Sequence, residues 1–99
     1  MCIFCDLKYN AIAENELCYA ILDKFPQTKG HTLIIPKRHI TTVFEMAPEE
    51  NRDAFALINE MKSRQDAENN PRGYNIAVNC GEVAGQAVMH AHVHLIPRY

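Results

Sequence analysis

Three of the five histidines of this 99-residue chain lie close together, at positions 90, 92 and 94. One small or apolar residue separates each from the next, in the sequence HAHVHLI. Because side chains alternate between the two faces of a β-strand, His90, His92 and His94 would project from one face at intervals of about 7 Å. Such a row can bind a metal ion, transfer protons or supply a nucleophile oriented by its neighbours. A polar sheet face without chemistry explains one isolated histidine better than three at this spacing.

The elements that must position this row are predicted by the pattern of apolar and turn-forming residues. A helix is predicted from Pro48 to about Glu68, because a proline suits the first helical turn. Within it, Phe55, Ile58 and Met61 recur at three-residue spacing. Apolar runs between turn residues predict strands at Glu16–Asp23, His31–Lys37, Tyr74–Cys80 and Val88–Ile96. This content predicts an α+β fold, an antiparallel sheet of about five strands with one long helix.

Composition is that of an ordinary globular protein, with 47% hydrophobic and 22% charged residues. The length predicts one domain over residues 1–99. A net charge of −2 argues against a general nucleic-acid or membrane-surface binder, since both need a basic surface. No apolar run is long enough to span a bilayer and no signal peptide is recognised, so a cytoplasmic location is predicted. There the four cysteines are expected to be thiols or metal ligands.

Cys2 and Cys5 form a Cys-x-x-Cys pair at the start of the chain. Such a pair is half of a tetrahedral thiolate site, a redox pair, or two unrelated thiols. A dithiol redox motif usually lies where a strand meets a helix, whereas this pair begins at the second residue. His39 and His90 are candidates to complete a site of two cysteines and two histidines, although the separations are not those of a zinc finger.

The run HAHVHLI follows the pattern His-φ-His-φ-His-φ-φ, where φ is apolar, and on it the chain resembles the histidine triad (HIT) family of nucleotide-binding proteins and hydrolases. The resemblance extends over nearly the whole chain, through CIFC, ILDKFPQTKGHTLIIPKRHI and VNCGEVAGQAVMHAHVHLIPR. CIFC together with PKRH is similar to the zinc-containing branch of the family, which is related to adenosine phosphoramidases.

For the triad, the resemblance implies covalent catalysis. His92 would attack the α-phosphorus of a nucleotide, expel the leaving group and form a nucleotidyl-histidine that water hydrolyses. A neutral imidazole can attack only if its other ring nitrogen carries the proton, and a nearby backbone carbonyl can hold that N–H. The resemblance implies that His94 contacts the phosphate and the leaving group, where a cationic ring would offset developing charge. His31, which opens a predicted strand, is expected to be structural.

For the cysteine pair, the zinc-containing branch implies one structural zinc ion with no open position for water, bound by Cys2, Cys5, His39 and His90. The ion would tie the N-terminus to the triad strand and support a small core. A competing interpretation makes all the triad histidines metal ligands. It predicts more than one metal ion per chain, and loss of metal when His92 or His94 is replaced.

The segment GEVAGQ, residues 81–86, has a good length for a hairpin loop between the last two predicted strands. Its glycines can be plain turn residues, or can let backbone amides approach an anion closely. The resemblance implies phosphate contacts from Asn79, Gly85 and Gln86. Phosphoramidase-like relatives usually carry Ser or Thr after the Gly-Gln pair, whereas this chain has Ala87, which removes a hydroxyl that can assist the leaving group.

Asp23 follows an apolar run and precedes a turn, which places its carboxylate at a strand end. On spacing alone a solvated aspartate is the simpler interpretation, whereas the resemblance of ILDKFPQ implies that it accepts both ribose hydroxyls. Ile3, Phe4 and Leu22 are candidates for enclosing a purine, although core packing explains each equally well. Such a stacking pocket does not distinguish adenine from guanine, and the phosphoramidase resemblance favours adenosine.

We therefore predict a hydrolase that cleaves nucleoside 5′-phosphoramidates or related nucleotidyl conjugates and releases the nucleoside monophosphate. A dinucleoside polyphosphate hydrolase and a nucleotide-binding scaffold with negligible turnover are the alternatives. The resemblance also implies a homodimer, to which the helix from Pro48 to Glu68 could contribute. The sequence stops three residues after the predicted triad strand, where many relatives continue with a segment that contacts the partner subunit, so lower selectivity and dimer strength are expected.

Overall fold

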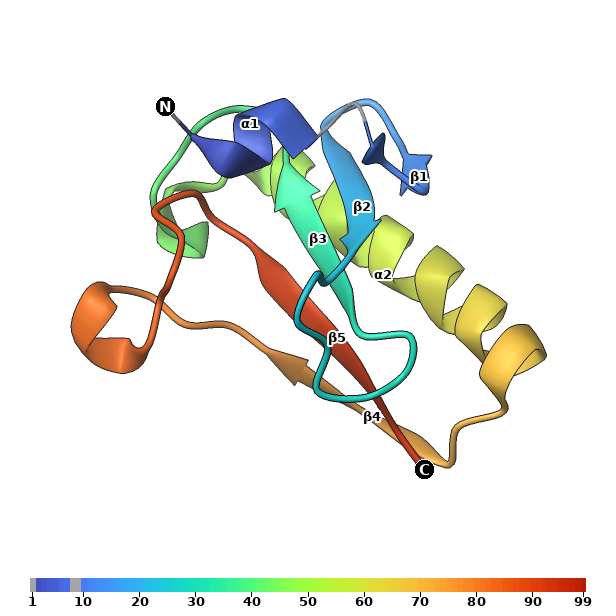
Figure 1. The fold of residues 1–99 in the computed structure, drawn as a ribbon. Coiled ribbons are helices and arrows are strands. Elements are labelled where there is room, and N and C mark those ends of the chain that lie inside the picture. Colours follow the sequence, from blue (N-terminus) through green and yellow to red (C-terminus); the bar gives the residue numbers. More distant parts are fainter. Residues whose placement is uncertain (1, 8–9) are drawn as a thin grey trace.

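The computed structural model describes residues 2–7 and 10–99, and its main feature is a five-stranded antiparallel sheet (Figure 1). The strands lie side by side in the order β1-β2-β3-β5-β4. The long helix α2 covers one face of this sheet, and the short helix α1 lies over the other (Figure 1). The predicted α+β fold, with about five strands and one long helix, is confirmed. In chain order the elements are α1 (Ile3–Leu7), β1 (Ala13–Glu14), β2 (Cys18–Leu22), β3 (Thr32–Pro36), η2 (Val43–Glu45), α2 (Pro48–Asn69), β4 (Gly73–Ala77), η3 (Glu82–Ala84) and β5 (Val93–Arg98).

The two faces of the sheet bury two separate apolar clusters, because successive residues of a strand point to opposite sides. On β2, Cys18 and Ala20 pack toward α2, whereas Tyr19 and Ile21 pack toward α1. The Tyr19 hydroxyl donates to the carbonyl oxygen of Phe4, which fastens α1 to the sheet. Burial on both faces explains why this strand reads as an almost continuous apolar run.

Helix α2 ends at Asn69, and Asn70 follows in the left-handed conformation that commonly closes a helix. Phe55, part of the predicted apolar spacing, lies outside the buried stripe, with 59% of its surface exposed. A step of three residues lags about 60° behind a full helical turn, so three-residue spacing drifts away from the sheet. Neither α2 nor any other described helix is long and apolar enough to cross a membrane. The buried side chains of α2 are Glu50, Ala54, Leu57, Ile58, Met61 and Gln65.

Strand β5 begins at Val93, so the predicted start at Val88 is wrong and only one triad histidine, His94, lies within the strand. The preceding segment is drawn away from β4 because the Ala91 N–H donates to the carbonyl oxygen of Ile40 at 2.7 Å. The three imidazoles are therefore not all on one strand. They still lie on the α1 side of the sheet, as predicted, because Phe4 contacts both His90 and His92, and the His92 and His94 ring centroids are 5.1 Å apart. The His90 ring belongs to one group of side chains, and the His92 and His94 rings to another.

Strand β4 ends at Ala77, short of the predicted Cys80, so residues 78–92 connect β4 to β5 in place of a six-residue hairpin loop. This connection includes η3 and extends away from the sheet (Figure 1). The last pair in the β4–β5 ladder joins Ala77 to His94. The pairing of these two strands was predicted correctly, and the length of their connection was not.

An ion pair between the exposed Arg38 and the buried Glu50 holds the segment after β3 against the start of α2. Arg38 donates to the Glu50 carboxylate through Nη2 at 2.7 Å and through Nε at 3.3 Å. Glu50 also accepts the Ala47 N–H at 2.8 Å, which satisfies a donor at the helix N-terminus. The hydrogen bond from Arg38 holds the pKa of Glu50 below its usual range. Because His39 follows Arg38 directly, this pair also fixes the backbone beside a predicted metal ligand.

We expect Glu50→Gln to lower the free energy of unfolding by about 1–3 kcal/mol at pH 7, since it weakens charge-assisted bonds to a buried group. A depressed carboxyl pKa contributes stability above the unfolded-state value near 4.3 and loses it as pH falls through the folded-state value. The difference in unfolding free energy between the unchanged protein and Glu50→Gln should therefore shrink below about pH 4. Urea unfolding at several pH values measures this difference. Glu49→Gln, at the exposed neighbouring position, is the control, and equal losses in both variants would contradict the prediction.

Candidate active site and metal centre

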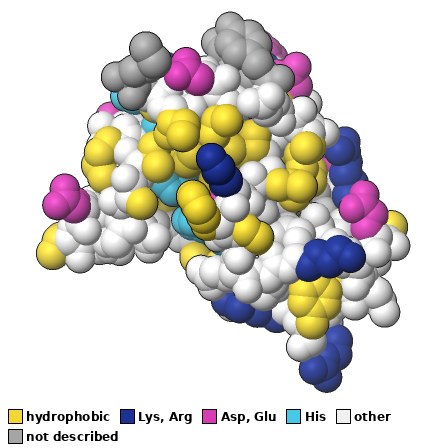
Figure 2. All heavy atoms as spheres, in the orientation of Figure 1, with side chains coloured by type: hydrophobic (Ala, Val, Ile, Leu, Met, Phe, Trp, Pro, Cys, Tyr) yellow, Lys and Arg dark blue, Asp and Glu magenta, His cyan; other side chains and the backbone are white. Residues whose placement is uncertain are grey.

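The face of the sheet beside α1 carries a cavity of about 820 Å³ between α1, β2 and the segment leading into β5. Figure 2 looks onto this face and shows histidine surface between hydrophobic side chains. Imidazoles and a carboxylate on the wall of a mainly apolar cavity are typical of a small-molecule site. Six residues selected from the sequence line the cavity: Ile3, Phe4, Leu22, Asp23, His92 and His94.

Asn79, Gly85 and Gln86, suggested from the sequence for phosphate contacts, are not among the residues that line this cavity. Gln86 is buried, where its Oε1 accepts the Gly81 N–H at 2.8 Å and its Nε2 donates to the carbonyl oxygen of Thr41 at 2.6 Å. Gly85 has a φ of 94°, a conformation that favours glycine, and the Asn79 side chain lies beside it. These contacts shape the β4–β5 connection, and a phosphate role for the three residues remains a prediction.

His92 is buried edge-on against Phe4, with ring centroids 4.9 Å apart. Its Nδ1 lies 2.8 Å from the carbonyl oxygen of His90. Because a carbonyl oxygen only accepts hydrogen bonds, Nδ1 must carry the proton, and Nε2 keeps its lone pair. The expected carbonyl partner for this ring is confirmed. Burial lowers the pKa of His92, which favours the neutral form that can act as a nucleophile.

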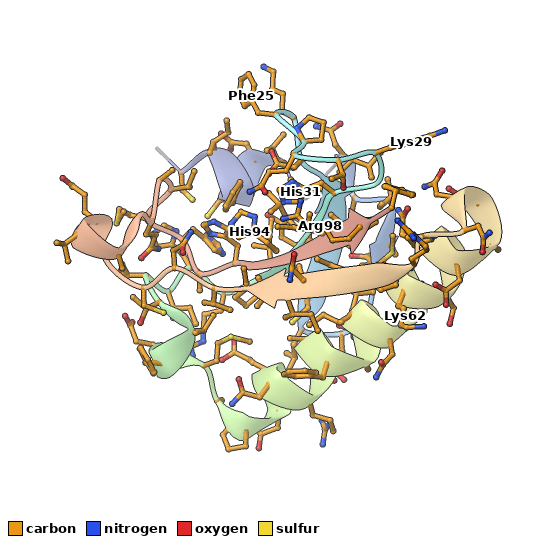
Figure 3. The ribbon with its side chains drawn as sticks, turned by 90° about the horizontal axis from the view of Figure 1, so that it is seen from below. Phe25, Lys29, His31, Lys62, His94 and Arg98 are labelled. Carbon is orange, nitrogen blue, oxygen red and sulfur yellow. The ribbon has the colours of Figure 1, made fainter. Side chains whose placement is uncertain are left out.

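His94 is hydrogen-bonded to His31, and His31 in turn lies beside the Asp23 carboxylate. The Nε2 atom of His31 lies 2.9 Å from Nδ1 of His94 and 3.4 Å from Oδ2 of Asp23. Figure 3 shows His31 and His94 on the side of β5 away from α2. His31 was expected to be only structural, yet it joins the candidate ribose ligand to the candidate phosphate ligand. The pairing of β3 with β5, which the sequence did not specify, brings it there.

Electrostatics keep these two rings neutral in the free protein. Burial lowers the pKa of both His31 and His94, and the neighbouring His31 lowers that of His94 further. The Asp23 carboxylate opposes the shift in both rings. Because burial and the neighbouring His31 disfavour a charged ring, the cationic His94 suggested from the sequence would need the negative charge of a bound phosphate to stabilise it.

A separate group gathers around the first turn of α1 and the segment after β3, and its four ligand atoms all lie within 4.8 Å of one another. Cys2 Sγ lies 3.3 Å from His90 Nδ1, Cys5 Sγ lies 3.3 Å from His39 Nδ1, and the two Nδ1 atoms are 3.2 Å apart. Ligands at zinc distances of about 2.0–2.3 Å on a tetrahedron stand roughly 3.3–3.8 Å apart, so the spacing fits zinc. This group contains Cys2, Cys5, His39 and His90.

The tautomer of His90 also fits a metal ligand. Its Nε2 lies 2.8 Å from the carbonyl oxygen of Pro36, so Nε2 carries the proton and Nδ1 presents a lone pair to the two thiols. Metal-binding histidines typically donate their second N–H to such an acceptor. The four side chains could therefore hold a metal ion such as zinc.

A family model for the HIT domain matches residues 6–99 of the chain. The chain belongs to the HIT family. It shares 43% identity with a HIT family protein from Bacillus anthracis, whose crystal structure superimposes with a TM-score of 0.92 over 99% of this chain and 73% of that one. It is also 37% identical to the adenosine 5′-monophosphoramidase of Schizosaccharomyces pombe, over 98% of this chain and 74% of the relative. For this HIT protein, these similarities support a nucleotide hydrolase at the level of its class.

A third HIT relative bears on the metal. A Zn-bound histidine triad family protein from Mycobacterium smegmatis is 35% identical, with a TM-score of 0.89 over 99% of this chain and 75% of that one. This similarity and the converging cysteine and histidine ligands of the present chain together support a metal-binding group at its N-terminal end.

Proposed function

We propose that this HIT protein hydrolyses nucleoside 5′-phosphoramidates or related nucleotidyl conjugates at the α-phosphate and releases the nucleoside monophosphate. The observation that carries the proposal is the orientation of His92. Its Nδ1–H is held by the carbonyl oxygen of His90, which leaves Nε2 as a lone pair on a ring that lines the cavity. A buried neutral imidazole fixed in this way is an activated nucleophile.

The reaction would proceed in two displacements at phosphorus. In the first, Nε2 of His92 bonds to the α-phosphorus and the P–N bond to the leaving amine breaks, while His94, protonated when the anionic substrate is bound, donates a proton to that amine and becomes neutral. In the second, water attacks the same phosphorus and gives its proton to His94, and the P–Nε2 bond breaks. After the first step His92 carries the positive charge as a nucleotidyl-imidazolium, and the second step returns that charge to His94, so the two steps together restore the protein and release nucleoside monophosphate and a free amine.

Asp23 would accept the two ribose hydroxyls. Its Oδ1 already accepts the Phe25 N–H at 2.9 Å, which fixes the carboxylate on the cavity wall. Ile3, Phe4 and Leu22 line the same cavity and would enclose the base, with adenosine as the nucleoside expected from the phosphoramidase relative.

We expect Asp23→Ala to lower kcat/KM for adenosine 5′-phosphoramidate by about 10- to 100-fold, because hydrogen bonds to a charged group contribute about 1.5–3 kcal/mol. The matched comparison is the 2′-deoxy substrate. The unchanged protein should discriminate against it, whereas Asp23→Ala should treat the two substrates alike. Discrimination that survives in the variant would remove Asp23 from ribose recognition.

Ala87 lines the cavity, at the position where the family resemblance implies a hydroxyl in phosphoramidase-like proteins. We expect Ala87→Ser to raise kcat for adenosine 5′-phosphoramidate by about tenfold, because the hydroxyl can assist proton delivery to a poor leaving group. The 4-nitrophenyl ester of AMP needs no such proton and should be cleaved at an unchanged rate. Ala84→Ser, in η3 of the same connection and outside the cavity lining, is the control.

We also infer a homodimer, which acts in the cytoplasm. Strand β4 is the last strand of the sheet, and a terminal strand presents backbone groups that can pair with another chain. Its Ile76 side chain is 52% exposed. A reducing compartment suits a pair of cysteines that bind zinc as thiolates.

The test of the proposed function is release of AMP from adenosine 5′-phosphoramidate, measured beside diadenosine polyphosphate. Turnover with kcat/KM highest for the phosphoramidate supports the proposal. A preference for the dinucleotide would assign the chain to the second enzymatic class. Binding of AMP without turnover of either substrate would make it a nucleotide-binding scaffold.

A further inference from the structure

The loop between β2 and β3, residues 23–31, is fastened at its outer end to the C-terminal end of β5. Thr28 Oγ1 donates to the carbonyl oxygen of Pro97 at 2.6 Å, and the Tyr99 hydroxyl donates to that of Lys29 at 2.6 Å. Arg98 adds a hydrogen bond to the Gln27 side chain at 3.2 Å. Figure 3 shows Lys29 of this loop and Arg98 of β5 on the side that holds His31 and His94. These three hydrogen bonds therefore fix the backbone of the loop beside His31 and His94.

Inside this loop, the backbone N–H of Gln27 points at Nδ1 of His31, 3.1 Å away. A backbone amide can only donate, so Nδ1 of His31 must be unprotonated and the proton of its neutral ring must lie on Nε2. That Nε2–H lies 2.9 Å from Nδ1 of His94, which must then accept. The proton of neutral His94 is left on Nε2, the nitrogen that His31 does not engage.

We propose that the backbone amide of Gln27 sets the tautomers of His31 and His94, so that His94 keeps its proton on Nε2. The resulting tautomer is opposite to that of His92, whose proton is on Nδ1. One ring then presents a lone pair to a phosphorus atom while its neighbour presents an N–H to a phosphate oxygen or a leaving group. The assignment of these two roles to His92 and His94 rests on the proposed function, whereas the tautomers themselves can be measured without any substrate.

The same geometry decides against a metal ion at this place. Asp23, His31 and His94 offer ligand atoms within 4.8 Å of one another, as metal sites do. A histidine that binds a metal through Nε2 needs its proton on Nδ1, facing an acceptor. Here Nδ1 of His31 faces a donor, the Gln27 N–H. Binding a metal ion through Nε2 would place a proton on Nδ1, and that proton would clash with the proton of the Gln27 N–H. The Gln27 N–H, His31 and His94 form a chain in which each group donates a hydrogen bond to the next. The cysteine and histidine group differs, because Nδ1 of His90 is unprotonated and can face a metal ion.

The decisive measurement is long-range ¹H–¹⁵N correlation of the zinc-loaded chain with ¹⁵N-labelled histidine, at a pH where the rings are neutral. We expect the proton on Nε2 of His31 and His94, and on Nδ1 of His92. A proton on Nδ1 of His94 would overturn the proposal. Titration with Co²⁺ is a second test, because it counts the metal ions bound per chain. A second bound ion that disappears in Asp23→Asn would also overturn the proposal.

Two variants at position 27 separate the amide from the side chain. Gln27→Pro removes the N–H, whereas Gln27→Ala keeps it and removes only the contact to Arg98. We expect Gln27→Pro to move the His31 proton to Nδ1 and to lower kcat for the phosphoramidate by about tenfold or more, with a smaller effect on the 4-nitrophenyl ester. Gln27→Ala should keep both tautomers.

Unchanged tautomers in Gln27→Pro would overturn the proposal, and the spectrum of the unchanged chain tests it whether or not this variant folds. Failure of this inference is distinguishable from failure of the proposed function. If the expected tautomers are found but no substrate is turned over, only the proposed function is contradicted. If substrate is turned over but His94 carries its proton on Nδ1, only this inference is contradicted.

Discussion

Replacing His92 by alanine is expected to abolish AMP release from adenosine 5′-phosphoramidate, with a loss in kcat of about 10⁴-fold or more, as for other covalent nucleophiles. The native ring has its Nδ1–H fixed by the His90 carbonyl, so no reorientation is needed before Nε2 attacks. Alanine removes the attacking atom. Rapid quenching of the native protein should reveal one adenylyl group bound per chain, and the variant should show none.

The matched variant is His94→Ala, which removes the proton donor and leaves the nucleophile. With the phosphoramidate it should lose about 10²- to 10⁴-fold in rate, the contribution typical of general acid catalysis. With the 4-nitrophenyl ester, whose leaving group needs no proton, His94→Ala should recover most of its activity and His92→Ala none. Because His92 is buried against Phe4, AMP binding by both variants must first show that the cavity survives. Equal recovery of the two would contradict the assignment of roles.

Local sequence patterns were sufficient for the elements and for the type of chemistry. The helix was predicted to within about a residue at each end, and strands β2 and β3 to within one or two residues at each end, whereas the predicted start of β5 was wrong. The two-residue spacing of the histidines did single out two side chains, His92 and His94, that line the cavity. It could not show that the segment before Val93 leaves the sheet, because the bond from Ala91 to Ile40 joins residues far apart in the sequence.

Contacts between distant segments account for the rest of the site. His31 has no motif of its own, and it acquires a partner only because β3 pairs with β5. Gln86 was suggested as a phosphate ligand by the family resemblance, and the structure adds a contact that the sequence did not reveal, from its amide to the carbonyl oxygen of Thr41. Which nitrogen of each ring carries the proton depends on backbone groups such as Gln27 N–H, which no side-chain pattern reveals.

Loss of the zinc site should have the second large effect, on stability. We expect Cys2→Ala to bind no zinc and to lower the unfolding free energy by about 4 kcal/mol when free zinc is a thousandfold above Kd. For a chain of this size that corresponds to a fall in Tm of roughly 15 °C or more. Metal analysis and thermal unfolding measure both. Cys80→Ala, a cysteine outside the group, is the control, and equal Tm values in the two variants would contradict a structural ion.

The zinc site should also matter for catalysis, although it lies outside the reaction. His90 would supply a ligand through its ring, and its carbonyl oxygen is the acceptor that orients His92. Removing the ion would take away its bonds to the four side chains, so the His90 ring and its carbonyl oxygen would be held less tightly, by the bond to Pro36 and the weaker contacts to the thiols and His39. We therefore expect chelation to reduce kcat at a temperature where the chain is still folded, with recovery when zinc is returned. An unchanged kcat in a metal-free, folded chain would show that the sheet alone holds the nucleophile in place.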